Sequence, residues 1–176
     1  MIMTVLDAAN WAPSGMNRQQ WEFLVVTGPK ISGMAESYWR VVEEYTRNWD
    51  AVPMRGSLSR EDFIRFAKTY GGAPIVIVVL TDMADTPDLR KANIESASAA
   101  MENLLLAATA LGLGTCWMTG PLRDEVTLRR ILRIPDEKRS LPSRRLVIRK
   151  GHRQTRPGTI RRLNEKSAGW YESCIF

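Results

Sequence analysis

The sequence is poor in the residues that carry catalysis without a cofactor. It has one histidine, His152, and two cysteines, Cys116 and Cys174, among 176 residues. A Cys/His zinc site is nearly excluded because its ligands are missing, and a Ser-His-Asp triad would have to use His152. If the chain is an enzyme, we therefore expect a bound cofactor to supply the chemistry. We predict no metal site and name no catalytic side chain.

Long hydrophobic runs are also absent. The longest, residues 73–80, has the length of a strand, and residues 1–15 lack the basic start and apolar stretch of a signal peptide. We therefore expect no membrane segment and take the cytoplasm as the compartment. The length fits a single domain. Cys116 lies in an apolar stretch, where we expect a small buried residue and not a nucleophile.

Positive charge is concentrated near the C-terminus. The chain carries a net charge of +6, but residues 139–166 hold ten Lys or Arg and one acid, so the rest is net negative. Such a region is typical of contact with phosphate, on a nucleic acid or on a cofactor, or of a merely solvated surface. No aromatic residue is interleaved with these charges before Trp170. A nucleic-acid-binding module is therefore only a remote alternative.

Helical and extended patterns alternate along the chain. We expect helices over residues 3–10, 31–48, 60–70, 90–112 and 124–134, and strands over 21–27, 73–82, 114–120 and, briefly, 146–148. The stretch 73–82 is a continuous β-branched run, as in a strand buried on both faces. The helix 90–112 is rich in small residues, which allow close approach of another helix or of a partner subunit. This alternation predicts an α/β or α+β sandwich with helices covering a sheet.

Two segments carry a family resemblance. Residues 12–23 read Ala-Pro-Ser-Gly-Met-Asn-Arg-Gln-Gln-Trp-Glu-Phe and lead into an apolar strand. The small-residue helix is followed by Leu-Gly-Thr-Cys-Trp-Met-Thr-Gly at 113–120. Both segments resemble the nitroreductase family, whose signature runs Ala-Pro-Ser-x-x-Asn-x-Gln-Pro-Trp-x-Phe and whose central helix leads into a glycine-rich strand and turn. The resemblance runs from about residue 3 to residue 172.

The chain departs from the family pattern in three places. Gln20 stands where the family usually has proline. The family's N-terminal Arg-Ser segment, which grips the flavin, has no counterpart in this sequence. Residues 139–150 hold only three consecutive apolar residues where the family has a largely apolar strand. We therefore expect a short or displaced last strand and an irregular, basic region over 139–166.

The resemblance implies both a fold and a function. The fold is a single nitroreductase-like domain over residues 1–176, an α+β sandwich with a central, mostly antiparallel sheet, flanking helices and a long central helix. The function is transfer of hydride from NADH or NADPH through FMN to an electron-poor small-molecule acceptor such as a nitroaromatic, quinone or enone. The family works as a homodimer with sites at the subunit interface. The alternative is a flavin-binding or degenerate member without turnover.

The resemblance also assigns cofactor contacts and an acceptor pocket. The cofactor contacts come from the loop after the first helix, from the backbone of the turn after residue 117 and, for the phosphate, from the basic region: Pro13, Ser14, Asn17, Gln19, Met118, Thr119, Gly120, Arg161 and Arg162. From the residues alone, Ser14 and Asn17 are equally turn formers, and the two arginines equally solvated surface. By resemblance the acceptor pocket falls in residues 45–70, where we find no motif; Trp49 and Phe66 are our guesses within it.

Overall fold

The computed structural model describes residues 1–49 and 59–135 with their side chains, and residues 138–150 as a strand. Every predicted helix and strand is present. In chain order the elements are α1 (Ile2–Asn10), η1 (Gly15–Asn17), β1 (Trp21–Thr27), α2 (Pro29–Tyr45), α3 (Arg60–Thr69), η3 (Tyr70–Gly72), β2 (Ile75–Asp82), α4 (Pro87–Ala110), β3 (Leu113–Met118), η4 (Gly120–Asp124), α5 (Glu125–Leu132) and β4 (Lys138–Lys150).

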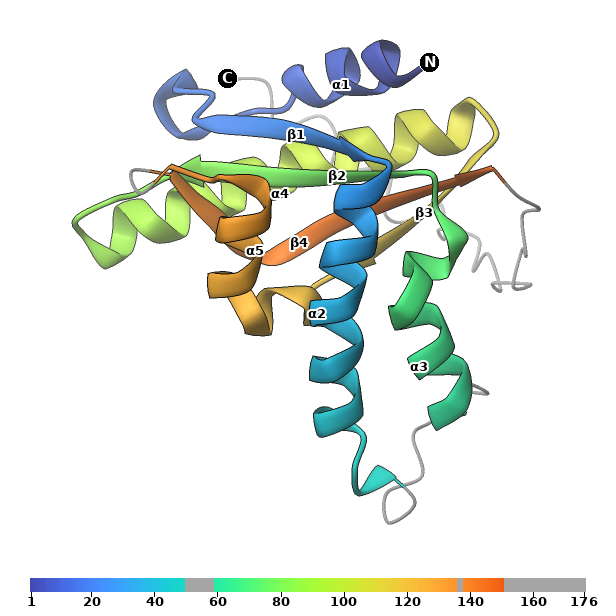
Figure 1. Cartoon of the computed structure of the whole chain (residues 1–176). Helices are drawn as coiled ribbons and strands as arrows, with labels where there is room; N and C mark the ends of the chain where they lie inside the picture. Colours follow the sequence, from blue (N-terminus) through green and yellow to red (C-terminus); the bar gives the residue numbers. More distant parts are fainter. Residues whose placement is uncertain (50–58, 136–137, 151–176) are drawn as a thin grey trace, which may run out of the picture.

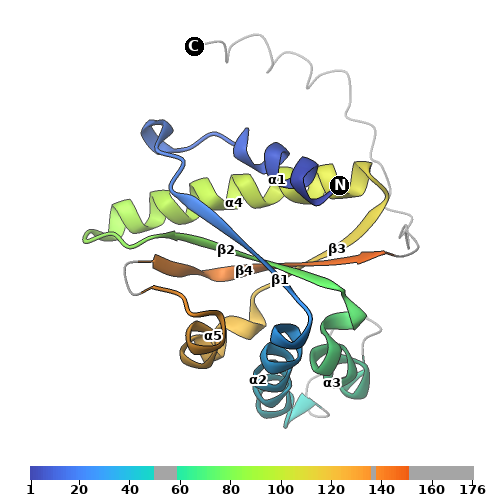
Figure 2. The ribbon, with the colours of Figure 1, turned by 45° about the horizontal axis from the view of Figure 1, so that its top comes forward.

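The four strands form one antiparallel sheet in the order β1-β2-β4-β3. Helices α1 and α4 cover one face, and α2, α3 and α5 cover the other (Figure 1, Figure 2). The predicted α+β sandwich with a central antiparallel sheet and a long helix is therefore confirmed. None of the helices in the described part of the chain has the length and apolar character that a bilayer crossing requires.

Strand β2 separates two hydrophobic cores. Ile77 and Val79 face the α1/α4 layer, whereas Val78 and Leu80 pack against the α2/α3/α5 layer, because successive side chains of a strand point to opposite faces. All four are at most 1% exposed, as the continuous β-branched run predicts. On α4, small buried residues such as Ala97 lie in the same cluster as α1, so the two helices can pack closely.

The last strand differs from the prediction. We expected a short strand at 146–148 within an irregular region, but β4 runs from Lys138 to Lys150. It lies between β2 and β3, with a register shift opposite residues 78–80. A strand inside a sheet has backbone hydrogen-bond partners on both sides, so extended structure does not require a long apolar run. The rest of the basic region, including Arg161 and Arg162, lies outside the described residues.

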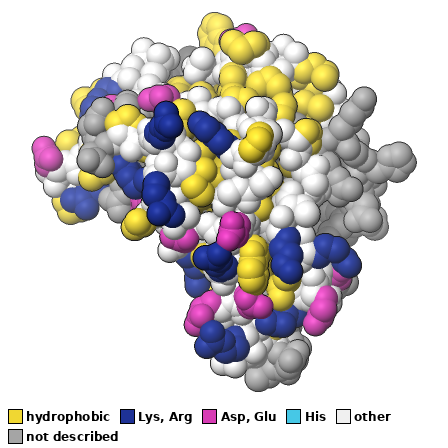
Figure 3. Space-filling model, in the orientation of Figure 1, with side chains coloured by type: hydrophobic (Ala, Val, Ile, Leu, Met, Phe, Trp, Pro, Cys, Tyr) yellow, Lys and Arg dark blue, Asp and Glu magenta, His cyan; other side chains and the backbone are white. Residues whose placement is uncertain are grey.

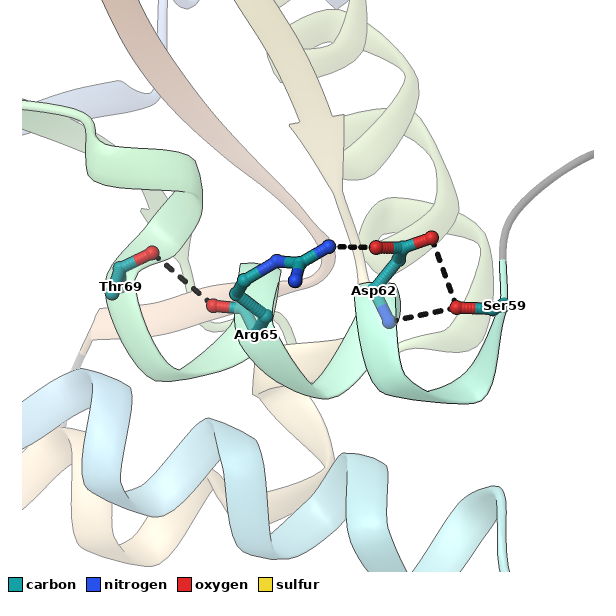
Figure 4. A network of polar contacts seen from close by, with 4 residues as sticks. All are labelled: Ser59, Asp62, Arg65 and Thr69. Carbon is teal, nitrogen blue, oxygen red and sulfur yellow. Dashed lines mark hydrogen bonds and ion pairs between the residues drawn. The ribbon is translucent and has the colours of Figure 1, made fainter.

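Hydroxyl caps set the start of two helices. Thr86 accepts a hydrogen bond from the Leu89 N–H at 3.3 Å, so α4 begins three residues earlier than predicted. Ser59 accepts one from the Asp62 N–H at 3.0 Å and donates one to the Asp62 carboxylate at 2.9 Å (Figure 4). This cap orders the first turn of α3, the helix that carries one wall of the cavity described below.

Candidate functional site

A cavity of about 550 Å³ lies between α2, α3 and the end of β3. Its lining is mostly aromatic and aliphatic: Tyr38, Val41, Val42, Tyr45, Trp49, Phe63, Phe66, Cys116, Trp117, Met118, Thr119, Gly120 and Arg123. Small-molecule sites are commonly of this size and character, with a few polar groups that orient the ligand. The predicted residues Met118, Thr119 and Gly120 all line it, and so do Trp49 and Phe66.

Helical periodicity builds one wall of the cavity. The lining residues of α2 stand at positions 38, 41, 42 and 45, which is the spacing of one helix face. Phe63 of α3 stacks on Trp49 with ring centroids 5.4 Å apart and planes inclined by 20°. Trp49 in turn makes an edge contact with Tyr45 at 6.0 Å. These rings form the aromatic end of the cavity.

The other end of the cavity is the turn that follows β3. A Cβ atom at Gly120 would lie 2.9 Å from Cε2 and 3.2 Å from Oη of Tyr38. The Tyr38 ring is only 3% exposed and packs against Tyr70, with centroids 5.5 Å apart, and against Phe63. A side chain at 120 would therefore collide with a buried ring of the same chain unless the turn or the ring shifts.

Arg123 is the only charged residue among those that line the cavity in the described chain. It lies on η4, and its guanidinium carbon is 4.6 Å from the centroid of the Tyr45 ring, a cation–π contact. Sequence reasoning missed this residue, since nothing in the order of residues 114–123 indicates that η4 turns back toward α2. The contact depends on the tertiary packing of η4 against α2.

The neighbouring Asp124 anchors η4 and α5 to α2. Its carboxylate accepts hydrogen bonds from the Ser37 hydroxyl at 2.6 Å and from the Thr127 N–H at 3.2 Å. Desolvation opposes ionisation, but the hydrogen bonds from Ser37 and Thr127, together with the charge of Arg130, outweigh it and hold the pKa of Asp124 below its ordinary value. Asp124 therefore stays charged and occupied by these partners.

Cys116 does not fit the sequence prediction of a buried residue. Its side chain is exposed and lines the cavity. Cys116 lies on β3, an edge strand of the sheet, in the part that borders the open cavity. Nearby cavity residues still desolvate the thiol and raise its pKa. A protonated thiol is a poor nucleophile, so the second part of the prediction, a non-catalytic role, remains our interpretation.

The loop between α1 and β1 carries the other predicted contacts. Pro13, Asn17 and Gln19 are exposed, and Ser14 is half-buried. Asn17 and Gln19 have left-handed backbones, with φ of 53° and 49°, and so does Met16 at 55°. Non-glycine residues seldom adopt this conformation. The Ser14 hydroxyl accepts a hydrogen bond from the Gln19 N–H at 2.9 Å, which closes the loop.

Within one chain this loop and the cavity stay apart. The loop packs on α4, where the Gly15 N–H donates to the Ser96 hydroxyl at 3.1 Å. Helix α4 covers one face of the sheet, whereas α2 and α3, which wall the cavity, cover the opposite face (Figure 2). The structure therefore brings Met118, Thr119 and Gly120 together at a cavity, but not Pro13, Ser14, Asn17 or Gln19.

The departure at Gln20 has a structural consequence. Its side chain is 6% exposed, and Oε1 has no hydrogen-bond partner within the described chain. The backbone carbonyl is satisfied by the Thr81 hydroxyl at 3.2 Å and the Asp82 N–H at 3.3 Å. A buried unpaired amide oxygen is costly. Gln20 adjoins the predicted loop, so this orphan acceptor lies next to the candidate cofactor contacts.

Large apolar side chains are exposed around α1 and the loop that follows it. Trp11 is 87% exposed, Met16 80%, Met1 73% and Met3 67%. Figure 3 shows hydrophobic side chains gathered along the top of the molecule, over α1. Contiguous apolar surface of this kind is typical of a protein interface. Among the described residues no cluster of His, Cys, Asp or Glu could hold a metal ion.

Comparisons of the sequence and of the structure with known proteins agree with each other. The family model described as Nitroreductase family matches residues 1–143. A protein from Archaeoglobus fulgidus, provisionally named NADH dehydrogenase/NAD(P)H nitroreductase, is 32% identical over 142 residues, which are 77% of this chain and 64% of that protein. The iodotyrosine deiodinase of Thermotoga neapolitana is 33% identical over 138 residues, 76% of this chain and 68% of its own length.

A solved structure agrees with these relatives. The crystal structure of an iodotyrosine deiodinase bound to FMN and 3-iodo-L-tyrosine superposes with a TM-score of 0.63 at 29% identity and covers 86% of this chain and 78% of that one. The chain spans about two thirds of the length of the curated relatives that it matches.

Proposed function

The chain belongs to the nitroreductase family, as residues 12–23 and 93–120 predicted, and from this premise we propose that it is an FMN-dependent oxidoreductase that uses NADH or NADPH. The observation that carries the proposal is the aromatic cavity that ends on the turn at 118–120. A protein of similar fold binds FMN, and relatives are named for NAD(P)H-dependent reduction.

The residues of this chain fit a flavin in two respects. The cavity offers apolar and aromatic walls of the kind that enclose a planar ring, and residues 118–120 line one end of it, where we propose that backbone N–H groups donate to the ring. The orphan Oε1 of Gln20 is a buried acceptor without a donor, as expected where a bound group or a second subunit completes a site. When bound, FMN would supply the redox chemistry, namely acceptance of a hydride and transfer of its electrons to the acceptor.

We propose that Met118, Thr119 and Gly120 hold the ring through their backbone, and that Pro13, Ser14, Asn17 and Gln19 contact it from the second subunit of a homodimer. The exposed loop and the distant cavity of one chain support this arrangement, because two copies can provide what one chain separates. Residues 161 and 162 are proposed phosphate contacts on the resemblance alone.

Exposed hydrophobic side chains also support the dimer. Trp11 precedes the predicted contacts and Met16 lies among them, and a partner would cover both side chains. Substitution Trp11→Glu places a charge in the proposed interface. It should shift the molecular mass in solution, measured by light scattering, toward the monomer and weaken FMN binding in parallel. A monomeric wild-type protein that binds FMN fully would contradict the proposed arrangement.

The acceptor is proposed to be a small electron-poor molecule, such as a nitroaromatic, quinone or enone. It would bind over the cofactor at the aromatic end of the cavity, near Trp49 and Phe66. The side chains described at this cavity include no titratable group apart from Cys116, Arg123 and the two tyrosines. We therefore assign protons to water and give the protein the tasks of binding, orientation and exclusion of bulk solvent.

The decisive experiment is an absorbance titration of the purified chain with FMN, followed by addition of NADH or NADPH. We expect about one flavin per chain and bleaching by one of the two donors. Flavin that binds but is never reduced would favour the alternative of a flavin-binding member without turnover.

Two variants test the proposed contacts of the loop. Asn17→Gly removes the amide but tolerates the left-handed backbone, and it should weaken FMN binding about tenfold, the size expected for one or two lost hydrogen bonds. Arg18→Ala, next in the loop and exposed, is the control and should bind FMN normally. Equal affinity of both variants would remove Asn17 from the site.

A further inference from the structure

Arg123 distinguishes this cavity from a purely hydrophobic one. The remaining lining residues in the described chain are aromatic, aliphatic, Cys116, Thr119 and Gly120, none of which carries a charge at neutral pH. The guanidinium lies over Tyr45 at the same end as the stacked pair of Trp49 and Phe63. The cavity therefore combines ring-stacking surfaces with one positive charge.

The charge of Arg123 is not neutralised within the described chain. None of the ion pairs there involves Arg123. The adjacent carboxylate, Asp124, is occupied by hydrogen bonds from Ser37 and Thr127 on the side of α2 and α5. A cation–π contact uses the face of the guanidinium, and its N–H donors lie in the plane, where they can still bind an anion.

We propose that the cavity selects aromatic ligands that carry a negative charge, such as an aromatic carboxylate, and that Arg123 is the residue that determines this selectivity. The ligand's ring would lie among Tyr45, Trp49 and Phe63, and its carboxylate would accept hydrogen bonds from the guanidinium. The statement that this ligand is the electron acceptor rests on the proposed function, whereas the statement that the cavity binds it does not. Arg123 is here a specificity-determining residue and takes no part in electron transfer.

The test compares two ligands of almost the same shape, 4-nitrobenzoate and 4-nitrobenzamide, by calorimetric titration of the full chain as purified. We expect the carboxylate to bind about five- to tenfold more tightly, the range for a charge-assisted contact that stays partly exposed to water. Arg123→Gln should abolish the preference by weakening the carboxylate alone. Arg40→Gln removes an equal charge from an exposed ion pair on α2 and should leave the preference intact.

Two further measurements separate charge from ring stacking. Added salt should reduce the preference, because Arg123 is solvent-exposed. Inorganic phosphate should compete only weakly. If phosphate binds as well as 4-nitrobenzoate, the site recognises an anion without its ring and the proposal is overturned. Equal affinity of the two nitro compounds for the wild type, or an unchanged preference in Arg123→Gln, would also overturn it.

Measurements of turnover distinguish failure of this inference from failure of the proposed function. Reduction of the nitro group to nitroso consumes two electrons and a proton from NAD(P)H and a second proton from solvent, and it releases one water. If both compounds are reduced with equal kcat/KM, the oxidoreductase function stands and the selectivity fails. If NAD(P)H neither bleaches bound flavin nor supports reduction of either compound, but the binding preference depends on Arg123, the selectivity stands and the proposed function fails.

Discussion

Replacing Gly120 with alanine should destabilise the protein through a single clash. The new Cβ would lie 2.9 Å from Cε2 of Tyr38, whereas carbon atoms in favourable contact are about 3.5–4.0 Å apart. Relief requires a shift of about half an ångström or more by either the turn or the Tyr38 ring. That ring is confined by Tyr70 and Phe63, so we expect a loss of about 1–3 kcal/mol in the free energy of unfolding, as for other overpacked cores.

Urea unfolding followed by circular dichroism measures this loss, and a double-mutant cycle identifies its source. Tyr38→Leu removes the ring atoms that the new methyl group meets, so Gly120→Ala should cost much less in that background. The matched control is Gly33→Ala on α2, whose Cβ would meet only Ile131 at an ordinary 3.7 Å. Alanine in a helix should stabilise there by roughly 0.5–1 kcal/mol.

Two results would refute this reasoning. Gly120→Ala could unfold at the wild-type urea concentration, which would mean that the turn adapts freely. Alternatively, its cost could be the same with tyrosine or leucine at 38, and then the backbone of residue 120 and not the ring contact would require glycine. If the clash moves the turn, the proposed function adds that FMN affinity should fall in Gly120→Ala and recover in part with Tyr38→Leu.

Three further predictions concern the neighbourhood of the site. Gln20→Met removes the unpaired buried oxygen at similar volume and should raise the free energy of unfolding of the FMN-free monomer by about 1 kcal/mol in urea titrations; a lower stability of that monomer would show that the amide has a partner within the chain. Ser59→Ala removes the cap on Asp62 and should lower the thermal midpoint, at a cost of about 1 kcal/mol; an unchanged midpoint would mean that the cap is dispensable. Ser37→Ala should raise the pKa of Asp124 toward its ordinary value. A carboxyl whose pKa is lowered in the folded state stabilises the fold at pH values above its ordinary pKa of 3.8, and this contribution is lost as the pH falls through the native pKa. The wild type should therefore be more stable than Ser37→Ala at neutral pH, and the difference should shrink in acid. A stability difference that does not depend on pH would contradict the assignment.

Local patterns were sufficient to predict most of the fold. The β-branched run of β2 and the short apolar stretch of β1, which ends before Gly28 and Pro29, identify strands because both are strand-length runs of residues that favour extended structure. The resemblance at residues 12–23 located a loop whose left-handed residues no composition argument would identify. The weak apolar content of residues 139–150 misled the prediction of β4, because the extended state there comes from pairing with β2 and β3.

The residues of the candidate site were likewise predicted only in part from the sequence. The family pattern indicated residues 118–120, whereas Trp49 and Phe66 were chosen within residues 45–70 without a motif; all five line one cavity. Arg123 and Tyr38 were not indicated, because their relevance arises from the packing of η4 on α2. Arg161 and Arg162 lie outside the described residues, and their role stays a prediction.

The sequence by itself determined the family and the helices and strands up to α5. These follow from residue types and short-range spacing. Only the tertiary structure decided which side chains meet: that the Tyr38 ring lies close to the backbone of Gly120, that Arg123 is the charge in the described lining of an aromatic cavity, and that the loop at 13–19 lies apart from the turn at 118–120. Such contacts join residues far apart in the chain, and their formation depends on how whole layers pack on the sheet, which no local pattern encodes.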